Sequence, residues 1–194
     1  MDLPIILASA SPNRLNLLKQ IGIVPTKVIP ADIDETEKPR EKPVHLAGRL
    51  AVEKAKAIAS IVDLGIIIAA DTVPVVGGKI MRKASNEDEV RECLRLLSNK
   101  RHQVYTGVCV IRKAHNELKL AKKTVKSIVK FKNITPLEIE YYCQLGEGIG
   151  KAGGYTIGGY AESFVIFISG SFSNIIGLPL YETMNMVRSM GYYS

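Results

Sequence analysis

At 194 residues, with 46% hydrophobic and 23% charged residues, the chain has the composition of one globular domain, spanning residues 1–194, and not of a disordered protein. No basic stretch followed by an apolar one opens the sequence, and no apolar run approaches the roughly 18 residues of a membrane span, so we expect a cytoplasmic protein without a membrane partner. Three cysteines without a Cys-x-x-Cys pair indicate neither disulfides nor a thiolate zinc site, and the net charge of +7 favours anionic partners: nucleic acid, anionic lipid or a phosphorylated small molecule.

The first predicted elements are a strand, a tight turn and a helix. Residues 5–8, IILA, are a short apolar run typical of a strand covered on both faces. Ser11 can cap a helix that has Pro12 at its first position, and Gly22 marks its end. The expected buried stripe of this helix consists of Leu15, Leu17, Leu18 and Ile21.

An acidic loop and a second helix follow. Residues 30–43 hold three prolines and five acids without a hydrophobic period, which predicts a loop. A helix is expected over residues 44–61, with an inner face of Leu46, Leu50, Ala51, Ala55 and Ile58. A buried strand over 66–70 should then be interrupted at Asp71-Thr72 and continue into a hairpin turning at Gly77-Gly78.

Alternating helices and strands continue to the end of the chain. Ser85 with Asp88 resembles a capping box for a helix through Leu97, and two long strands joined near 113–117 fill residues 104–131. Thr135 with Glu138 is a fuller capping box for a helix that ends by Gly146. A strand over 164–168 and a helix from about 179 complete an α/β class with a mixed, twisted sheet and flanking helices.

Four stretches place polar residues where ligands of α/β sheets usually lie. The Ser9 and Ser11 hydroxyls, Arg14 and the N–H groups of the first helix together form a candidate phosphate-binding corner. An isolated Ser-Pro-x-Arg is more often a plain cap with a solvated arginine. A cation at a helix N-terminus is unfavourable unless an anion compensates for it.

Carboxylates and lysines supply the other three stretches. Asp71 directly follows apolar residues, and either accepts hydrogen bonds in a turn or, as we favour, pairs with Glu35 or Asp34 to bind Mg²⁺. Lys54 lies near the inner face of its helix, so its ammonium either reaches a cleft or, as is commoner, is solvated. For Lys83, between the hairpin and the next helix, an anion contact and a plain loop position are equally open.

Several other sequence features do not indicate a phosphate-binding, nucleophile or metal site. The segment GEGIGK lacks the phosphate-loop spacing and has Ala152 where a hydroxyl belongs. No G-x-S-x-G motif occurs, and the three histidines have no metal-ligand spacing. His102 is expected to be structural or on the surface.

The ordered motifs LASASPNRLNLL, DIDE, LAVEKAKA, AADTVPVVGGKIMRK, HQVYTG, GKAGGYTIGG and GSFSNIIGLPLYET resemble the Maf family of nucleoside triphosphate pyrophosphatases over about residues 5–190. The resemblance implies two lobes around a central cleft, often a homodimer, and hydrolysis of a nucleotide to the monophosphate and pyrophosphate with Mg²⁺ or, alternatively, Mn²⁺. It implies substrate-binding roles for Ser9, Arg14, Lys54 and Lys83, metal binding by Glu35 and Asp71, and proton acceptance by Asp71.

The same resemblance points to the branch that hydrolyses dTTP and UTP, with three departures. Asn13 replaces a second arginine, Ala84 replaces a proline, and Gly158 replaces a glutamine. These changes imply relaxed base selection or weaker phosphate binding.

Two rival functions remain at this point. One is a nucleic-acid-binding regulatory protein that uses the seven lysines between residues 112 and 132, although these lack the interleaved aromatic residues needed for base stacking, so we expect no specific nucleic acid. The other is a Maf-like protein that binds nucleotides with little or no turnover.

Overall fold

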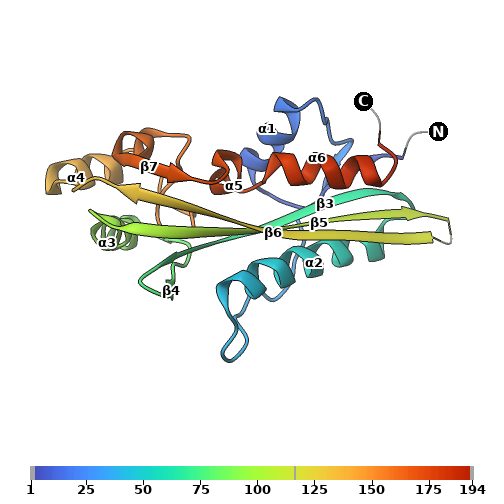
Figure 1. Ribbon diagram of the computed structural model, residues 1–194, viewed down its shortest axis with the longest axis horizontal. Helices are drawn as coiled ribbons and strands as arrows, with labels where there is room; N and C mark the ends of the chain where they lie inside the picture. Colours follow the sequence, from blue (N-terminus) through green and yellow to red (C-terminus); the bar gives the residue numbers. More distant parts are fainter. Residues whose placement is uncertain (1–2, 116, 193–194) are drawn as a thin grey trace. The chain divides into compact units, whose positions relative to one another are not determined.

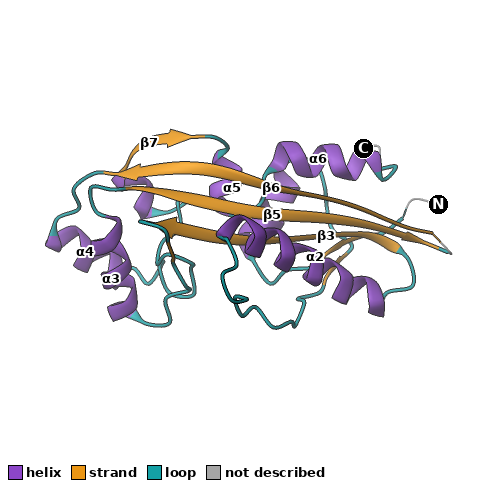
Figure 2. Ribbon diagram, turned by 60° about the horizontal axis from the view of Figure 1, so that its bottom comes forward, coloured by secondary structure: helices purple, strands orange, loops and turns teal. Residues whose placement is uncertain are grey.

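The computed structural model describes residues 3–115 and 117–192, and its strands form one seven-stranded mixed sheet (Figures 1 and 2). The hydrogen-bonded order is β2-β1-β3-β5-β6-β7, with β4 paired to β3 outside this path. The chain divides into two compact units. The first comprises Met1–Asp71, Thr106–Val125 and Gly177–Ser194, and the second comprises Thr72–Tyr105 and Lys126–Ile176. The single domain over 1–194 stays a prediction, and the mixed α/β class is confirmed.

The first unit begins with the predicted strand, turn and helix. Strand β1 (Ile5–Leu7) is buried and runs parallel to β2 (Lys27–Val28) and to β3 (Gly65–Val76). Helix α1 (Pro12–Gln20) has Ser11 as its N-cap, and Gly22 takes a φ of +77° just beyond its end, as expected for a C-terminal glycine. Leu17 and Leu18 are buried, whereas Leu15 and Ile21 are only partly so.

Helix α2 (Pro43–Ile61) packs closely on strand β5 (Arg101–Ala114). All five residues predicted for its inner face are buried. A Cβ on Gly107 would lie 2.1 Å from the carbonyl oxygen of Ala47, so glycine is required for this approach. Lys113 donates from Nζ to the carbonyl oxygens of Ala59 and Val62, both at 2.8 Å, and supplies the positive charge that the last turn of α2 lacks.

The predicted interruption at Asp71-Thr72 is wrong, because β3 runs without a break from Gly65 to Val76. Asp71 is the one charged residue of this buried strand, and an ion pair with Lys54 compensates its charge. The backbone therefore has no reason to leave the sheet. The hairpin at Gly77-Gly78 is confirmed, with β4 at Lys79–Ile80.

The second unit contains β4, α3, α4, β7 and α5, whereas β3, β5 and β6 contribute residues to both units. Helix α3 (Glu87–Leu97) is capped by Asn86, whose side chain accepts from the Glu89 N–H, so the predicted Ser85 cap is wrong. Ser85 instead donates its N–H and hydroxyl to the Glu89 carboxylate. The N-cap lies one residue later than predicted, because the Asn86 side chain can accept from the N–H groups that have no partner within the first turn of α3.

The later elements follow the prediction closely. Strand β6 (Glu117–Phe131) follows β5, and α4 (Pro136–Gln144) has the complete Thr135 capping box. Strand β7 (Val165–Ser169) pairs antiparallel with β6, and α6 (Leu180–Ser189) begins after Pro179. Three short elements were not predicted: β2, the 3₁₀ helix over Tyr160–Phe164, and α5 (Phe172–Ile176).

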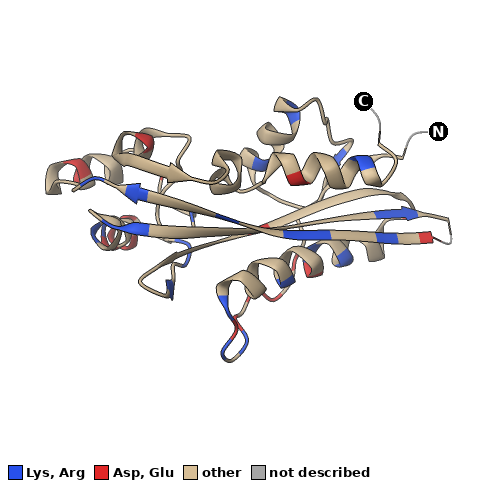
Figure 3. Cartoon of the chain, in the orientation of Figure 1, with Lys and Arg blue, Asp and Glu red and all other residues tan. Residues whose placement is uncertain are grey.

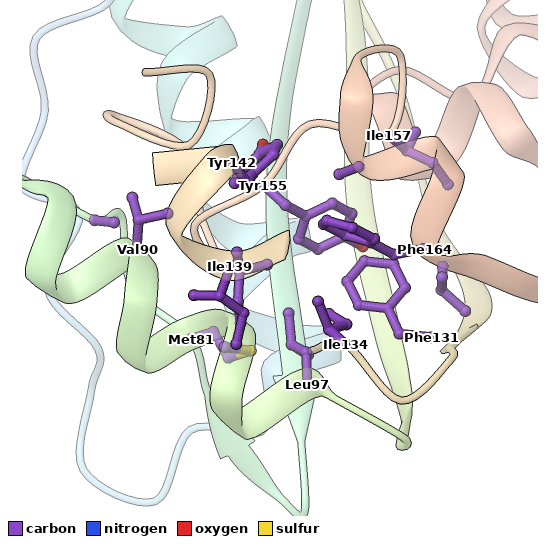
Figure 4. Packing of buried hydrophobic residues seen from close by; sticks show 14 of the residues in the cluster. Met81, Val90, Leu97, Phe131, Ile134, Ile139, Tyr142, Tyr155, Ile157 and Phe164 are labelled. Carbon is purple, nitrogen blue, oxygen red and sulfur yellow. The ribbon is translucent and has the colours of Figure 1, made fainter. Parts of the chain in front are cut away.

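The core of the second unit includes the aromatic residues Phe131, Tyr142, Tyr155 and Phe164 (Figure 4), and His102 is buried against two of them. His102 Nε2 lies 2.7 Å from the Tyr155 hydroxyl, and its ring packs edge-on against Phe131. Burial lowers the pKa of His102 to about 4. The Nδ1 atom has no hydrogen-bond partner among the described residues, so the neutral ring is structural, which is one of the two predicted alternatives.

We expect His102 to make folding sensitive to acid. An unfolded histidine titrates near 6.5, so below that pH the unfolded chain binds a proton that the folded chain does not, until about pH 4. Stability should fall across this window by about 3 kcal/mol. Chemical denaturation at several pH values should show a shallower slope for His102→Phe. His45→Gln, which changes an exposed histidine, should keep the wild-type slope, and equal slopes for both variants would exclude this origin.

Two further observations concern membrane-spanning helices and the cysteines. Within residues 3–115 and 117–192, no helix is long and apolar enough to cross a membrane. All three cysteines are free; Cys109 and Cys143 are buried, and Cys93 is half-buried.

Candidate active site

Two acids and one lysine of the first unit meet at a single point. The ammonium of Lys54 in α2 lies 2.6 Å from Asp71 Oδ1 in β3 and 2.7 Å from Glu35 Oε1 in the loop before α2. The side chains of Lys54 and Asp71 are 9% and 11% exposed, whereas that of Glu35 is 41% exposed. We call these three residues the Lys54 centre, in which Lys54 and Asp71 are largely buried and Glu35 is partly exposed.

The sequence places Lys54 at this point through helical periodicity. Lys54 follows Leu50 by four residues on the inner face of α2, so its stem is covered by the core and its ammonium must find partners there. Of the two predicted alternatives, the solvated lysine is therefore wrong. Burying an ammonium is tolerated because two carboxylates compensate its charge.

Arg14 belongs to the same electrostatic group. Its Nε donates to the carbonyl oxygen of Gly177 at 2.8 Å, and its Nη1 donates to Ser9 Oγ at 3.0 Å. Burial lowers the pKa of Arg14, while the charges of Asp71 and Glu35 act in the opposite direction. An arginine remains charged under these conditions. The unfavourable cation at the start of α1 is thus compensated by the two acids.

The predicted phosphate-binding corner is occupied by internal contacts. Ser9 Oγ accepts from Arg14 and, at 3.2 Å, from the N–H of Ser11. The Ser11 side chain caps α1 by accepting from the Arg14 N–H at 3.5 Å. These bonds fix Arg14 and Ser9 beside one another, and their role toward substrate stays a prediction.

The structure distinguishes between the two acids of the loop. Asp34 Oδ1 accepts from the Thr36 N–H at 2.9 Å, and hydrogen bonds from Thr36 lower the pKa of Asp34. Asp34 therefore shapes the turn, and Glu35 is the acid that reaches Lys54. The residues by themselves left both acids open, whereas the family resemblance implied Glu35.

Lys83 lies in the second unit, whereas Lys54, Asp71, Glu35 and Arg14 lie in the first. It forms an isolated antiparallel bridge with Ala152, and its side chain is exposed. Ala84 beside it is buried. Gly158 faces open space, where a Cβ would meet nothing within 4 Å, so the fold itself does not exclude a larger residue there. The role of Lys83 toward substrate stays a prediction.

Arg49 and Glu41 of the first unit were not among the predicted site residues. Arg49 Nε donates to Glu41 Oε1 at 2.7 Å, and Arg49 Nη1 donates to Glu53 Oε2 at 2.8 Å. The i,i+4 spacing of Arg49 and Glu53 was a visible signal. No sequence signal indicated the ion pair between Arg49 and Glu41, because this pair depends on the path by which the loop returns to α2.

The donor set of the Lys54 centre suits a hard divalent cation. Glu35 and Asp71 each place one carboxylate oxygen against the Lys54 ammonium, and Mg²⁺ usually takes one or two carboxylates together with phosphate oxygens and waters. No cluster of three or more metal-ligating side chains forms in the part of the chain that the structure describes. Two carboxylates match the number of protein ligands that Mg²⁺ takes when phosphate oxygens and waters complete its shell, and metal binding by Glu35 and Asp71 stays a prediction.

Comparison with known proteins decides the family. A family model described as "Maf-like protein" matches residues 4–190. The chain belongs to the Maf family. This Maf protein is 56% identical over 192 residues to a protein of Rickettsia rickettsii (strain Sheila Smith) named "Nucleoside triphosphate pyrophosphatase", covering 98% of this chain and 89% of that protein. A Rickettsia felis protein of the same name is 55% identical, covering 98% and 95%.

Solved structures give a weaker likeness. The Maf protein matches the Staphylococcus aureus Ham1 protein at 24% identity and a TM-score of 0.43, over 65% of this chain and 71% of that one. At this level the likeness supports no statement about the site.

Proposed function

We propose that this Maf protein is a nucleoside triphosphate pyrophosphatase, a hydrolase that cleaves the α–β phosphoanhydride bond to give a nucleoside monophosphate and pyrophosphate. One observation carries the proposal: Glu35 and Asp71 share the ammonium of Lys54, with Arg14 in electrostatic range of both acids. The names of the relatives agree with it.

The chemistry is a displacement by water at the α-phosphorus. Asp71 orients the water and accepts its proton as the new P–O bond forms. The bond from the α-phosphorus to the bridging oxygen breaks, and pyrophosphate leaves with the electron pair. Lys54 keeps the Asp71 carboxylate in place through their 2.6 Å contact.

Positive groups stabilise the charge that develops on the phosphates. Arg14, Lys54 and Lys83 are the side chains assigned to this role, together with the N–H groups at the start of α1. Removal of a donor whose contact strengthens only in the transition state typically costs about 3 kcal/mol of barrier, whereas the contact assigned to Lys83 already forms with the bound triphosphate. Ser9 holds the Arg14 guanidinium and completes the phosphate-binding set. A bound Mg²⁺, held by Glu35 and Asp71, would supply Lewis-acid polarisation of phosphate oxygens.

The finer assignments belong to the same proposal. We assign dTTP and UTP, or modified nucleotides of that type, as substrates, and a homodimer in the cytoplasm as the working form. Two of the three departures, Asn13 and Gly158, support relaxed base selection or weaker phosphate binding, because a guanidinium and an amide are missing from the motifs.

Pyrophosphate release from a panel of ordinary and modified nucleoside triphosphates, with and without Mg²⁺, tests the proposal. We expect turnover with at least one pyrimidine triphosphate and none after chelation. Binding of nucleotide without release from any member of the panel would instead establish the non-catalytic regulatory alternative.

Lys83→Ala should chiefly weaken triphosphate binding. We expect KM to rise about tenfold with a smaller fall in kcat, since one charge-assisted contact to phosphate is lost. Steady-state kinetics with Lys79→Ala as control measure this, because Lys79 is an exposed lysine of neighbouring β4. Unchanged KM and kcat in Lys83→Ala would remove Lys83 from the site.

A further inference from the structure

The loop that carries Glu35 is fastened to α2 by one arginine. Arg49 binds Glu41 through two parallel hydrogen bonds, from Nε to Oε1 at 2.7 Å and from Nη2 to Oε2 at 2.8 Å. Its Nη2 also donates to the carbonyl oxygen of Thr36 at 3.0 Å, and its Nη1 to Glu53. We call these four residues the Arg49 clamp. Figure 3 shows acidic and basic residues side by side on this loop before α2.

The Arg49 clamp is partly withdrawn from water. The side chains of Arg49 and Glu41 are 16% and 9% exposed, and the hydrogen bonds from Arg49 lower the pKa of Glu41 to about 2. Bidentate pairs of this kind are stronger than ordinary surface ion pairs. The clamp therefore differs from the exposed salt bridges of this protein, which contribute little.

The clamp acts on the segment that presents Glu35. Residues 29–42, all described, contain no helix or strand, so their conformation depends on side-chain contacts. Thr36, whose carbonyl Arg49 binds, directly follows Glu35. Glu41 Oε2 also accepts from the Lys38 N–H at 3.0 Å, so the clamp fixes the loop at three successive points beyond Glu35.

We propose that Arg49 is a positioning residue for the reaction: by clamping the loop at Thr36 and Glu41, it holds the Glu35 carboxylate beside Lys54 and Asp71. This rests on the proposed function for its effect on turnover, but not for its effect on the loop. Arg49 makes no contact with substrate in this role. Arg49 affects the position of Glu35 through the backbone of Thr36, which directly follows Glu35.

The size of the effect follows from the cost of misplacing a reacting group. A displacement of about 1 Å can lower a rate about 100-fold. We expect Arg49→Gln to lower kcat about 10- to 100-fold and to change the nucleotide KM by less than about threefold, because Arg14 and Lys54 remain in place. Arg49→Lys should be intermediate, since an ammonium cannot bind Glu41 in two parallel bonds and Thr36 as well.

The second unit offers a matched control. Arg91 binds Glu140 through two parallel bonds of 2.6 and 2.8 Å and also contacts Asp88 of its own helix. This clamp joins α3 to α4 and includes none of the proposed site residues. Arg91→Gln should therefore lower stability as Arg49→Gln does, with kcat unchanged.

Hydrogen exchange measures the loop without reference to activity. In Arg49→Gln the amides of residues 33–42 should exchange faster than in wild type, whereas in Arg91→Gln they should not. Glu41→Gln weakens the same clamp from the loop side, and it takes the place of Arg49→Gln if that variant does not fold. Faster exchange together with lower kcat supports the proposal. Unchanged exchange, or unchanged kcat in an active protein, overturns it.

Chemical rescue separates positioning from general damage. Arg49 lines a cavity of about 610 Å³ between α2 and β6, so a guanidinium ion can reach the space left by Arg49→Ala. Millimolar guanidinium should restore part of the lost kcat in Arg49→Ala, and it should leave the wild-type kcat of Arg91→Ala unchanged. Absence of rescue together with wild-type loop exchange overturns the proposal. If wild type itself releases no pyrophosphate, the proposed function fails, and hydrogen exchange alone then decides the role of Arg49 in the loop.

Discussion

Asp71→Asn is expected to lower kcat about 1,000-fold and to leave the fold intact, because general acid–base groups typically contribute factors of 100 to 10,000. Asparagine keeps the size of the side chain and an oxygen for Lys54, but it cannot accept the proton of the attacking water. Lys54 also keeps Glu35 as a charged partner, so the buried ammonium is not left unpaired. The loss should therefore appear in turnover and not in stability.

Pyrophosphate release and thermal unfolding of the same preparation test this expectation. Asp63→Asn is the matched control, since Asp63 is exposed just beyond the end of α2. It should keep wild-type kcat. Pyrophosphate release at the wild-type rate by Asp71→Asn would refute the assignment of Asp71 as proton acceptor.

Lys54→Met should lower both stability and turnover. Methionine fills a similar volume but leaves Asp71, which is largely buried, facing Glu35 without a cation between them. Removing one partner of a buried ion pair costs about 3–5 kcal/mol, and we expect about 3 because Glu35 is partly solvated. Loss of one phosphate contact and of the support for Asp71 should lower kcat about 100-fold or more.

The response to Mg²⁺ without nucleotide distinguishes this centre from an ordinary buried pair. In Lys54→Met the two acids lack their cation, so Mg²⁺ should raise the melting temperature of the variant more than that of wild type. Lys56→Met, which removes an exposed lysine two residues along α2, should behave as wild type. Equal shifts in all three proteins would contradict a divalent site at Glu35 and Asp71.

Local rules predicted most of the secondary structure, because each rule depends on neighbours in the chain. The Ser11 cap with Pro12, the Thr135 capping box and the inner face of α2 all follow from spacings of one to four residues. The same rules were wrong where two local solutions compete. Ser85 and Asn86 both suit the start of α3, and the side-chain geometry selected Asn86.

The interruption expected at Asp71 shows a different limit. A carboxylate after five apolar residues indicates the end of a buried strand, since burying an unpaired charge is costly. Its partner Lys54 lies 17 residues earlier in the chain, in a helix. No local pattern contains that contact, so the sequence alone could not keep Asp71 within the strand.

The sequence by itself therefore determined the elements, the family resemblance and which chemical groups are available. Only the tertiary structure decided which groups meet: Lys54 with Asp71 and Glu35, Arg14 with Gly177 at a separation of 163 residues, and Arg49 with the loop. The physical reason is that these contacts satisfy buried charges and backbone carbonyls brought together by packing. The spacing of residues along the chain does not predict which of them this packing brings into contact.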